Sequence, residues 1–296
     1  MGRRLFIMAV TVTFAVGLVA VFTLSSMRQF DGTLIADIPY GDASTRQKLD
    51  LYLPDGEGPF PVILFVHGGG FSSGHKRAAN PRAVIRAGLA RGYAVASTNY
   101  RRSGEALFPA AADDVIAAVR FLQDHADDYD LARNRVATWG ASAGGNLAAM
   151  AALSDDTNVQ AAVIWFGPIR FDQMDAQFET LGLDPMLGAT DAANSPESQY
   201  LGVAVGAPDA ADLVQQASPQ SYITSDDPPV LIQHGTADRN VPILQSEFFA
   251  AELADVIGPS KVEFDAIAGA GHGGDAFVSD ANFDRVFLFL NAYLMD

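Results

Sequence analysis

The sequence predicts an α/β fold in which a mostly parallel sheet carries helices on both faces. Short, continuously apolar runs such as residues 62–66 recur along the chain, and this pattern is typical of strands that are buried on both faces. Helical stretches alternate with these runs, which implies right-handed crossovers between parallel strands. The chain of 296 residues is long for one domain but ordinary for a single large α/β sheet.

The first 28 residues are interpreted as a signal peptide or an N-terminal membrane anchor. Residues 5–24 are uncharged and follow Arg3 and Arg4, and a helix of this length spans about 30 Å, the thickness of the hydrocarbon layer. The apolar stretch is longer than that of a usual signal peptide and its cleavage site is weak, which favours an uncleaved anchor. Both interpretations predict an exported protein, periplasmic or extracellular, whose residues 29–296 form a single domain.

Composition narrows the possible chemistry. The formal charge of −16 argues against a nucleic-acid partner and disfavours a highly anionic substrate. The absence of cysteine excludes a disulfide framework, a thiolate metal site and a cysteine nucleophile. Hydroxyl, carboxylate and imidazole chemistry remain, and nothing in the sequence indicates an oligomeric state.

The N-terminal part of the domain is predicted to form an antiparallel pair of strands, followed by the first central strand of the sheet. Residues 33–38 and 47–53 alternate apolar and polar side chains, as paired strands do. The central strand 62–66 ends in His67-Gly-Gly-Gly-Phe71, whose backbone N–H groups can closely approach a ligand, as an oxyanion hole requires. We interpret His67 as structural, holding this loop by hydrogen bonds, because it precedes the predicted nucleophile.

The stretch Trp139-Gly-Ala-Ser-Ala-Gly-Gly145 predicts a nucleophilic serine. Ser142 lies between small residues, which a sharp turn from a strand into a helix requires. The flanks fit this context, since residues 135–139 resemble a short buried strand and residues 146–153 a helix. The N–H groups that open the helix favour developing negative charge.

Two further strand-helix units precede the serine. We expect a helix at 81–91, a strand at 93–97, a helix at 109–125 and a surface turn at 124–130. Asp113 and Asp114 are adjacent on the second helix and therefore point about 100° apart, which disfavours a shared metal ion. We interpret them as solvated or ion-paired, one of them bracing the loop at residues 100–102.

The regular alternation stops after the strand at 159–166. Residues 168–222 are too long for a simple connection and are predicted to be a cap insertion over the site. Their apolar side chains either wall a pocket for an acyl or aryl group or attach the cap to the core; these are Phe171, Met174, Phe178, Leu181, Leu183, Met186 and Leu187.

The last part of the chain supplies an acid and a base. Asp238 follows the strand 229–234 and His272 follows the strand 261–267, so both lie where open α/β sheets place their sites. We expect a helix at 243–257 between these two strands and a final helix at 277–294. The chemistry needs all three groups, because a serine hydroxyl is a poor nucleophile until an imidazole takes its proton, and a carboxylate orients that imidazole.

Other residues compete for these roles. His234 is the alternative base, but it lies at the end of its strand and is expected to pack there. Asp226 and Asp227 precede the strand and would fall at the wrong end of the sheet. Asp275 is a weaker candidate for the acid that stays open, because it lies close to His272 in the sequence.

Four motifs, HGGGF, GASAGGNLA, HGTADRNVP and GAGHGG, resemble those of α/β-hydrolase esterases, of the hormone-sensitive-lipase type and of the bacterial feruloyl and acetylxylan esterase-like group. The resemblance extends from about Tyr40 to the end of the chain and implies a mostly parallel sheet of about eight strands with helices on both faces.

The resemblance also implies carboxylic ester hydrolysis without a metal or organic cofactor. It makes Ser142 the nucleophile, His272 the base and Asp238 the orienting acid. The oxyanion hole is then formed by the N–H groups of Gly69, Gly70 and Ala143. The N-terminal helical cap of hormone-sensitive-lipase relatives has no evident counterpart here, so substrate range does not carry over.

The function predicted from the sequence is therefore a serine carboxylesterase that acts through an acyl-enzyme intermediate. Its substrate is expected to be a small-molecule or saccharide ester, with a short acyl group or a carbohydrate-linked one. A serine peptidase of the prolyl-oligopeptidase type shares the order of the three residues, and a non-catalytic surface binding protein on the same fold is the alternative outside the enzymes.

Overall fold

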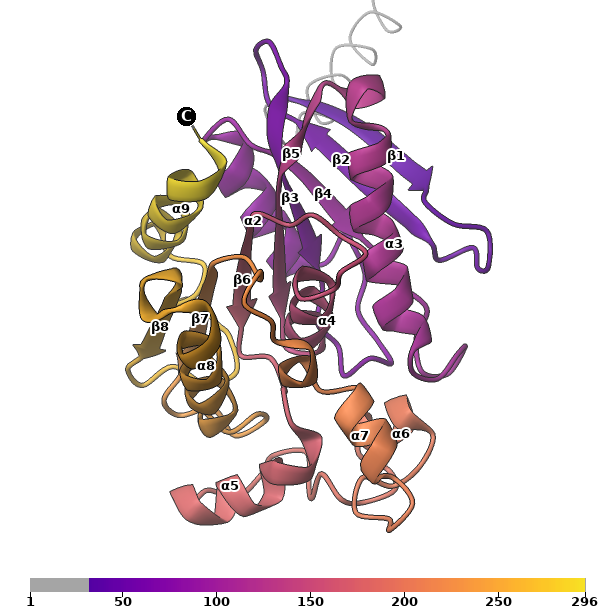
Figure 1. The fold of residues 1–296 in the computed structure, drawn as a ribbon, viewed down its shortest axis with the longest axis vertical. Coiled ribbons are helices and arrows are strands. Elements are labelled where there is room, and N and C mark those ends of the chain that lie inside the picture. The colour runs from indigo at the N-terminus through magenta and orange to yellow at the C-terminus, as the bar shows by residue number, and fades with distance from the viewer. Residues whose placement is uncertain (1–31, 296) are drawn as a thin grey trace, which may run out of the picture.

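The computed structural model describes residues 32–295, which centre on an eight-stranded sheet (Figure 1). The strand order is β1-β2-β4-β3-β5-β6-β7-β8. β1 pairs antiparallel with β2 and β2 with β4, and the other neighbours are parallel, so the predicted mostly parallel α/β sheet is confirmed. The strands are β1 (Thr33–Pro39), β2 (Lys48–Leu53), β3 (Phe60–Val66), β4 (Ala94–Thr98), β5 (Leu131–Ala141), β6 (Ala161–Trp165), β7 (Val230–Gly235) and β8 (Val262–Ile267).

Helices cover the two faces of this sheet. α3 (Ala110–Asp124), α4 (Ala143–Ala152) and α8 (Leu244–Ile257) contribute to one hydrophobic cluster, and α2 (Ala79–Leu89) and α9 (Asp280–Leu294) contribute to another. β3 supplies both clusters, since Leu64 and its alternate neighbours belong to the first and Phe65 belongs to the second. Burial on both faces explains why this strand has no polar side chain.

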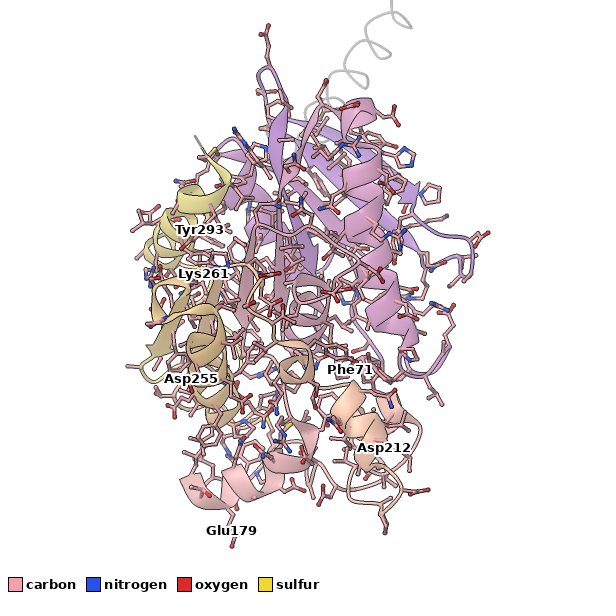
Figure 2. All side chains as sticks on the ribbon, viewed as in Figure 1. Phe71, Glu179, Asp212, Asp255, Lys261 and Tyr293 are labelled. Atoms are coloured by element: carbon pink, nitrogen blue, oxygen red, sulfur yellow. The ribbon has the colours of Figure 1, made fainter. Side chains whose placement is uncertain are left out.

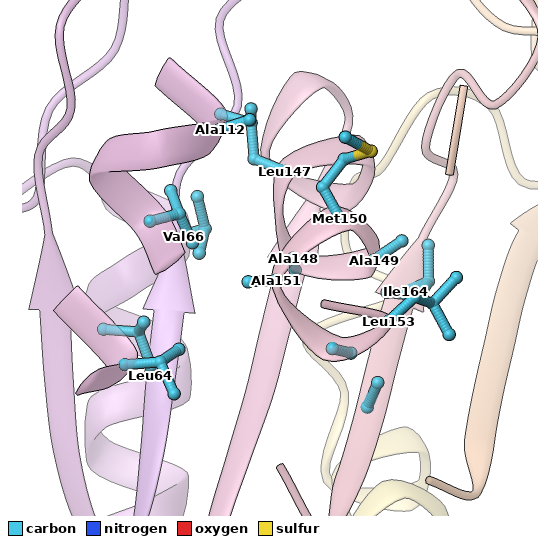
Figure 3. Close-up of a cluster of buried hydrophobic side chains, with 14 of the residues drawn as sticks. Leu64, Val66, Ala112, Leu147, Ala148, Ala149, Met150, Ala151, Leu153 and Ile164 are labelled. Carbon is cyan, nitrogen blue, oxygen red and sulfur yellow. The ribbon is translucent and has the colours of Figure 1, made fainter. Parts of the chain in front are cut away.

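α4 is the most deeply enclosed helix among the described residues, because every one of its side chains is buried. In Figure 3 its residues lie among side chains of β3, β6 and α3; those labelled are Leu64, Val66, Ala112, Leu147, Ala148, Ala149, Met150, Ala151, Leu153 and Ile164. Alanine or glycine at seven of its ten positions lets the helix lie close to the sheet. Truncating the fully buried Leu147 would cost about 2–5 kcal/mol of stability. The helix that follows Ser142 is therefore held rigidly.

Two helix starts differ by three residues from the sequence prediction. α4 begins at Ala143 rather than at residue 146, because the small residues after Ser142 are already helical and Gly145 N donates to Ser142 O over 2.7 Å. α9 begins at Asp280 rather than at residue 277, because the Ser279 side chain accepts a hydrogen bond from Asn282 N over 3.3 Å and caps the helix there.

The segment between β6 and β7 is helical and contains η2 (Phe171–Gln173), α5 (Met174–Leu181), α6 (Pro196–Leu201), α7 (Ala211–Gln216) and η3 (Pro219–Tyr222). α5, α6 and α7 gather at one end of the molecule, at the bottom of Figure 1. Of the apolar residues singled out in the sequence, Phe171, Met174 and Phe178 are buried in hydrophobic clusters, whereas Met186 and Leu187 are exposed. The buried ones attach the segment to the core.

Asp114 braces the loop after β4, as the sequence indicated for one of the two adjacent aspartates. It is fully buried, and Oδ2 accepts from Arg101 N over 2.7 Å while Oδ1 accepts from Arg101 Nη2 over 2.6 Å. Gln47 Nε2 donates to the same carboxylate over 2.7 Å. Asp113, one residue earlier, faces solvent.

The predicted membrane segment, residues 5–24, and the boundary at residue 28 lie outside the described residues. Within residues 32–295, no helix has both the length and the apolar character needed to cross a bilayer.

Candidate active site

Ser142 occupies a sharp turn between β5 and α4. Its backbone φ of 57° and ψ of −128° are rarely adopted by residues other than glycine, so the turn is strained. A side chain at Gly140 would lie 1.9 Å from the Gly144 carbonyl oxygen, and one at Gly144 would lie 2.2 Å from the Val66 carbonyl oxygen. The Ser142 N–H donates to Trp165 O on β6 over 2.9 Å, which fixes the turn to the neighbouring strand.

The three residues predicted from the sequence form one continuous hydrogen-bonded chain. His272 Nε2 lies 2.8 Å from Ser142 Oγ, and His272 Nδ1 lies 2.7 Å from Asp238 Oδ2. Ser142, Asp238 and His272 follow β5, β7 and β8, whose carboxyl ends lie at the same edge of the parallel sheet. This arrangement lets the serine donate its proton to His272 while His272 donates to the carboxylate.

Asp238 is held as a buried carboxylate. It is 1% exposed, and Oδ1 accepts from Asn240 N over 2.8 Å and from Val241 N over 3.1 Å. Burial alone would raise the pKa of Asp238, but hydrogen bonds from His234 and His272 hold that pKa well below its usual range. Asp238 is therefore a charged carboxylate at neutral pH.

His234 supports Asp238 from behind. Its Nε2 lies 2.9 Å from Val241 O and 3.2 Å from Asp238 Oδ2, so this nitrogen faces two acceptors and carries the proton. Its Nδ1 lies 2.7 Å from Ser246 Oγ and accepts from that hydroxyl. His234 is fully buried and has no contact with Ser142, which agrees with the prediction that it packs at the strand end.

The glycine loop follows β3 and faces Ser142. Tyr100 Oη donates to His67 O over 2.9 Å, and the His67 ring stacks on the Tyr100 ring at 4.5 Å. His67 Nδ1 donates to Gly68 O over 2.8 Å, and burial lowers the pKa of His67 to about 4. His67 is thus neutral and tied to the loop, as its structural interpretation predicted.

The predicted oxyanion donors line the same cleft as Ser142. Within residues 32–295 the N–H groups of Gly69, Gly70 and Ala143 donate no hydrogen bond to the protein. Gly69 has a φ of +133°, which side chains rarely adopt, so the loop conformation itself requires glycine at that position. Three N–H groups are consequently available for a bound ligand.

The cleft has a volume of about 440 Å³. Its lining comes from the glycine loop, the start of α2, the serine turn, the segment between β6 and β7, and the loops after β7 and β8. These residues are His67, Gly68, Gly69, Gly70, Phe71, Ala78, Ala79, Asn80, Pro81, Ala141, Ser142, Ala143, Phe166, Pro168, Leu187, Pro196, Glu197, Asn240, Val241 and His272. Of the apolar residues singled out in residues 168–222, Leu187 alone takes part.

The competing acids lie elsewhere. Asp227 binds Thr224 N over 2.7 Å before the start of β7, and Asp275 is exposed. Among residues 32–295, no group of three or more His, Asp or Glu side chains is placed to hold a metal ion.

Glu197 is a residue of this site that the sequence reasoning missed. It lies in α6, is 7% exposed and lines the cleft. No motif surrounds it, and its position follows only from how α6 packs on the glycine loop. The bond between His234 and Asp238 was also unforeseen, although their spacing of four residues across a strand end could have suggested it.

A family model, BD-FAE, matches residues 49–253, which is most of the described chain. The chain belongs to the BD-FAE family. This family match confirms the resemblance that the four motifs indicated.

Named relatives are esterases. The chain is 31% identical over 257 residues to Esterase LipQ of Mycobacterium tuberculosis, covering 81% of this chain and 57% of that protein. It is 30% identical over 238 residues to the probable carboxylic ester hydrolase LipM of the same organism, covering 74% of this chain and 52% of that protein. The chain thus spans about half the length of the curated relatives it matches.

A solved structure is similar over almost its whole length. The truncated form of a carbohydrate esterase from gut microbiota superposes with a TM-score of 0.77 at 27% identity, covering 88% of this chain and 96% of that chain. The fold and the named relatives of this BD-FAE family member are those of carboxylic ester hydrolases, as the motifs predicted.

Proposed function

We propose that the protein is a serine carboxylesterase that works through an acyl-enzyme intermediate. The observation that carries this proposal is the hydrogen-bonded chain from Ser142 Oγ through His272 to the buried Asp238, with 2.8 Å and 2.7 Å between the bonded atoms. The esterase names of the relatives support the same reaction class.

In the first half of the reaction, Ser142 Oγ attacks the ester carbonyl carbon and His272 Nε2 takes the serine proton. The N–H groups of Gly69, Gly70 and Ala143 hold the carbonyl oxygen as it becomes negatively charged, and loss of one such donor costs about 100- to 1000-fold in rate. The C–O bond to the alcohol then breaks, and His272 returns the proton to the departing oxygen.

In the second half, water replaces the alcohol. His272 Nε2 takes a proton from the water, whose oxygen attacks the acyl carbon, and the bond to Ser142 Oγ breaks as His272 returns that proton to the serine. Asp238 accepts from His272 Nδ1 throughout, which fixes the imidazole tautomer and stabilises its charged form.

The substrate we propose carries a short acyl group or a carbohydrate-linked ester. A cleft of about 440 Å³ suits an ester of modest size. The carbohydrate esterase among the similar solved structures supports a saccharide on the alcohol side.

A chain-length series of p-nitrophenyl esters, from acetate to decanoate, tests this proposal on the domain beside its Ser142→Ala variant. We expect turnover that is confined to short acyl chains and absent from the variant. Substantial activity in Ser142→Ala would overturn the assignment of the nucleophile, and activity confined to decanoate would overturn the short acyl group.

The same material distinguishes the alternatives. Preference for proline p-nitroanilides over p-nitrophenyl esters would favour a serine peptidase. Failure of the folded protein to react with a fluorophosphonate probe would favour a non-catalytic binding protein.

We also propose that the protein is exported and that residues 1–28 target or anchor it. The support is the uncharged stretch 5–24 after two arginines. Fractionation of cells that express the full chain tests this: recovery in the membrane or periplasmic fraction is expected, and recovery with cytoplasmic markers would contradict it.

A further inference from the structure

Glu197 brings a carboxyl group into the cleft beside the nucleophile. Phe71, at the end of the glycine loop, lies beside α6 (Figure 2), and its ring stacks on Tyr200 of that helix at 4.0 Å. The start of α6 lies against the loop itself, because a side chain added at Gly70 would come within 3.1 Å of Pro196 Cβ. Glu197, the next residue, is therefore held at the wall of the cleft that also contains Ser142 and His272.

This carboxyl group is buried, and its hydrogen-bonding partner within the protein is its own backbone N–H. It is 7% exposed, and within residues 32–295 no ion pair and no hydrogen bond from another residue reaches it. The other buried carboxylates of residues 32–295 are bound by other residues, since Asp50 is paired with Lys76, Asp114 with Arg101 and Asp238 with His272, and Asp227 accepts from Thr224 N. A carboxyl group can accept more hydrogen bonds than one backbone N–H supplies, so the place of Glu197 at the cleft points to a further partner that arrives from outside.

The surroundings indicate which chemistry that partner has. The pKa of Glu197 is raised to about 7, chiefly by burial and with a contribution from the charge of Asp175, whereas the hydrogen bond from its own backbone N–H and the nearby His272 oppose the rise. Near neutral pH both protonation states are thus accessible, one donating and the other accepting a hydrogen bond. A hydroxyl group can do both, so it fits either state of Glu197, whereas an ammonium group fits only the ionised state.

We propose that Glu197 binds a hydroxyl group of the substrate next to the scissile ester, and thereby selects esters of polyhydroxylated alcohols such as saccharides. This inference rests on the proposed function, because it assigns the alcohol side of the same esterase reaction. Glu197 is the one carboxylate among the cleft-lining residues, and its place in α6 makes the segment between β6 and β7 a source of substrate selectivity.

Two acetate esters of matched ring size test the proposal, a mono-O-acetylated methyl xylopyranoside and cyclohexyl acetate, which lacks the hydroxyl groups. The measured quantity is the ratio of their kcat/KM values. The wild type is expected to favour the sugar ester, and Glu197→Leu is expected to reduce that ratio about 10- to 100-fold, the effect of losing one hydrogen bond to an ionisable group. Glu197→Gln, whose amide still donates and accepts, should retain most of the preference.

Gln199→Leu is the matched control, because Gln199 lies exposed on the same helix, and it should leave the ratio unchanged. An equal fall of both kcat/KM values in Glu197→Leu would show that Glu197 only supports the fold and would overturn the proposal. So would a wild-type preference for cyclohexyl acetate, or for acetylcholine over the sugar ester.

If Glu197→Leu does not fold, the wild-type ratios across a series of deoxy sugar acetates decide the question, since no loss on removing any hydroxyl overturns the proposal. Failure of the wild type to hydrolyse any ester, p-nitrophenyl acetate included, would instead refute the proposed function itself.

Discussion

Replacing Asp238 by asparagine is expected to abolish most of the activity while leaving the fold in place. In the native site Oδ1 accepts from two backbone N–H groups and Oδ2 accepts from the two imidazoles of His272 and His234. An amide offers only one oxygen, so its NH₂ group must face one of these two pairs of donors. The backbone donors cannot lose their protons, so the NH₂ group turns towards the imidazoles.

His272 responds by changing tautomer. Its Nδ1 must then accept from the amide, which moves the imidazole proton to Nε2, the nitrogen that lies 2.8 Å from Ser142 Oγ. A protonated Nε2 cannot take the serine proton. A wrong tautomer of this kind costs about 10⁴-fold in kcat, or about 5 kcal/mol of transition-state stabilisation.

The assay is p-nitrophenyl acetate hydrolysis by Asp238→Asn, with Asp275→Asn as the matched control and a thermal melt of each variant. Asp275 is exposed and should tolerate the change with less than about twofold loss, as surface positions usually do. Retention of more than a tenth of wild-type kcat by a folded Asp238→Asn would refute the reasoning. A larger loss in Asp275→Asn would show that the acid was wrongly chosen.

Three further predictions concern the surroundings of the site. Gly144→Ala places a methyl group 2.2 Å from the Val66 carbonyl oxygen and should lower the free energy of unfolding by about 3 kcal/mol or more in a urea titration. Gly104→Ala is the control, because the space around Gly104 is open, and it should leave the free energy of unfolding unchanged. Equal stability of the two variants would contradict the close packing of the serine turn. Glu197→Gln should stabilise the protein increasingly as the pH rises. The pKa of Glu197 in the folded state is about 7, above the ordinary 4.5, so its side chain contributes stability below pH 4.5 and loses that contribution above about pH 7. Relative to pH 4, the free energy of unfolding gained by the substitution should reach about 3 kcal/mol at pH 8, and a difference between variant and wild type that is the same at both pH values would disprove this. His234→Phe should lower the free energy of unfolding by about 1–3 kcal/mol, because it leaves the Ser246 hydroxyl and the Val241 carbonyl without partners. It should also lower kcat, but by less than Asp238→Asn does. A variant that matches the wild type in both measurements would show that His234 supports neither the fold nor Asp238.

Much of the fold could be predicted from the sequence because the strands are buried on both faces. Burial on both faces leaves each strand as an unbroken apolar run, and the run in β3 ends at the glycine loop. The positions of Ser142, Asp238 and His272 followed for the same reason, since the carboxyl end of a parallel strand has only one place in the sheet. These elements carry their own local signal.

The cleft wall could not be predicted in the same way. Glu197 lies on a six-residue helix whose position depends on long-range contacts, such as the stacking of Tyr200 on Phe71. The apolar residues between β6 and β7 had the composition of a pocket wall, yet Phe171 and Phe178 face hydrophobic clusters. Composition indicates that such residues are buried, but only the packing decides what they are buried against.

The helix starts were misplaced for local reasons. The small residues after Ser142 do not repeat apolar side chains at helical spacing, so periodicity could not identify the first turn of α4. The strained turn at Ser142 nevertheless requires a helix to begin there. At α9 the Ser279 cap was present in the sequence and was a better marker of the start than the apolar residues before it.

The central claim is that Ser142 Oγ carries the acyl group during turnover. The most direct measurement is to mix the protein with p-nitrophenyl acetate, quench with acid before the first turnover is complete, and locate the added mass by peptide mass spectrometry. An acetyl group on the peptide that contains Ser142, and none in Ser142→Ala, is the result expected. Ester turnover with the acetyl group on another residue, or with no covalent adduct at all, would contradict it.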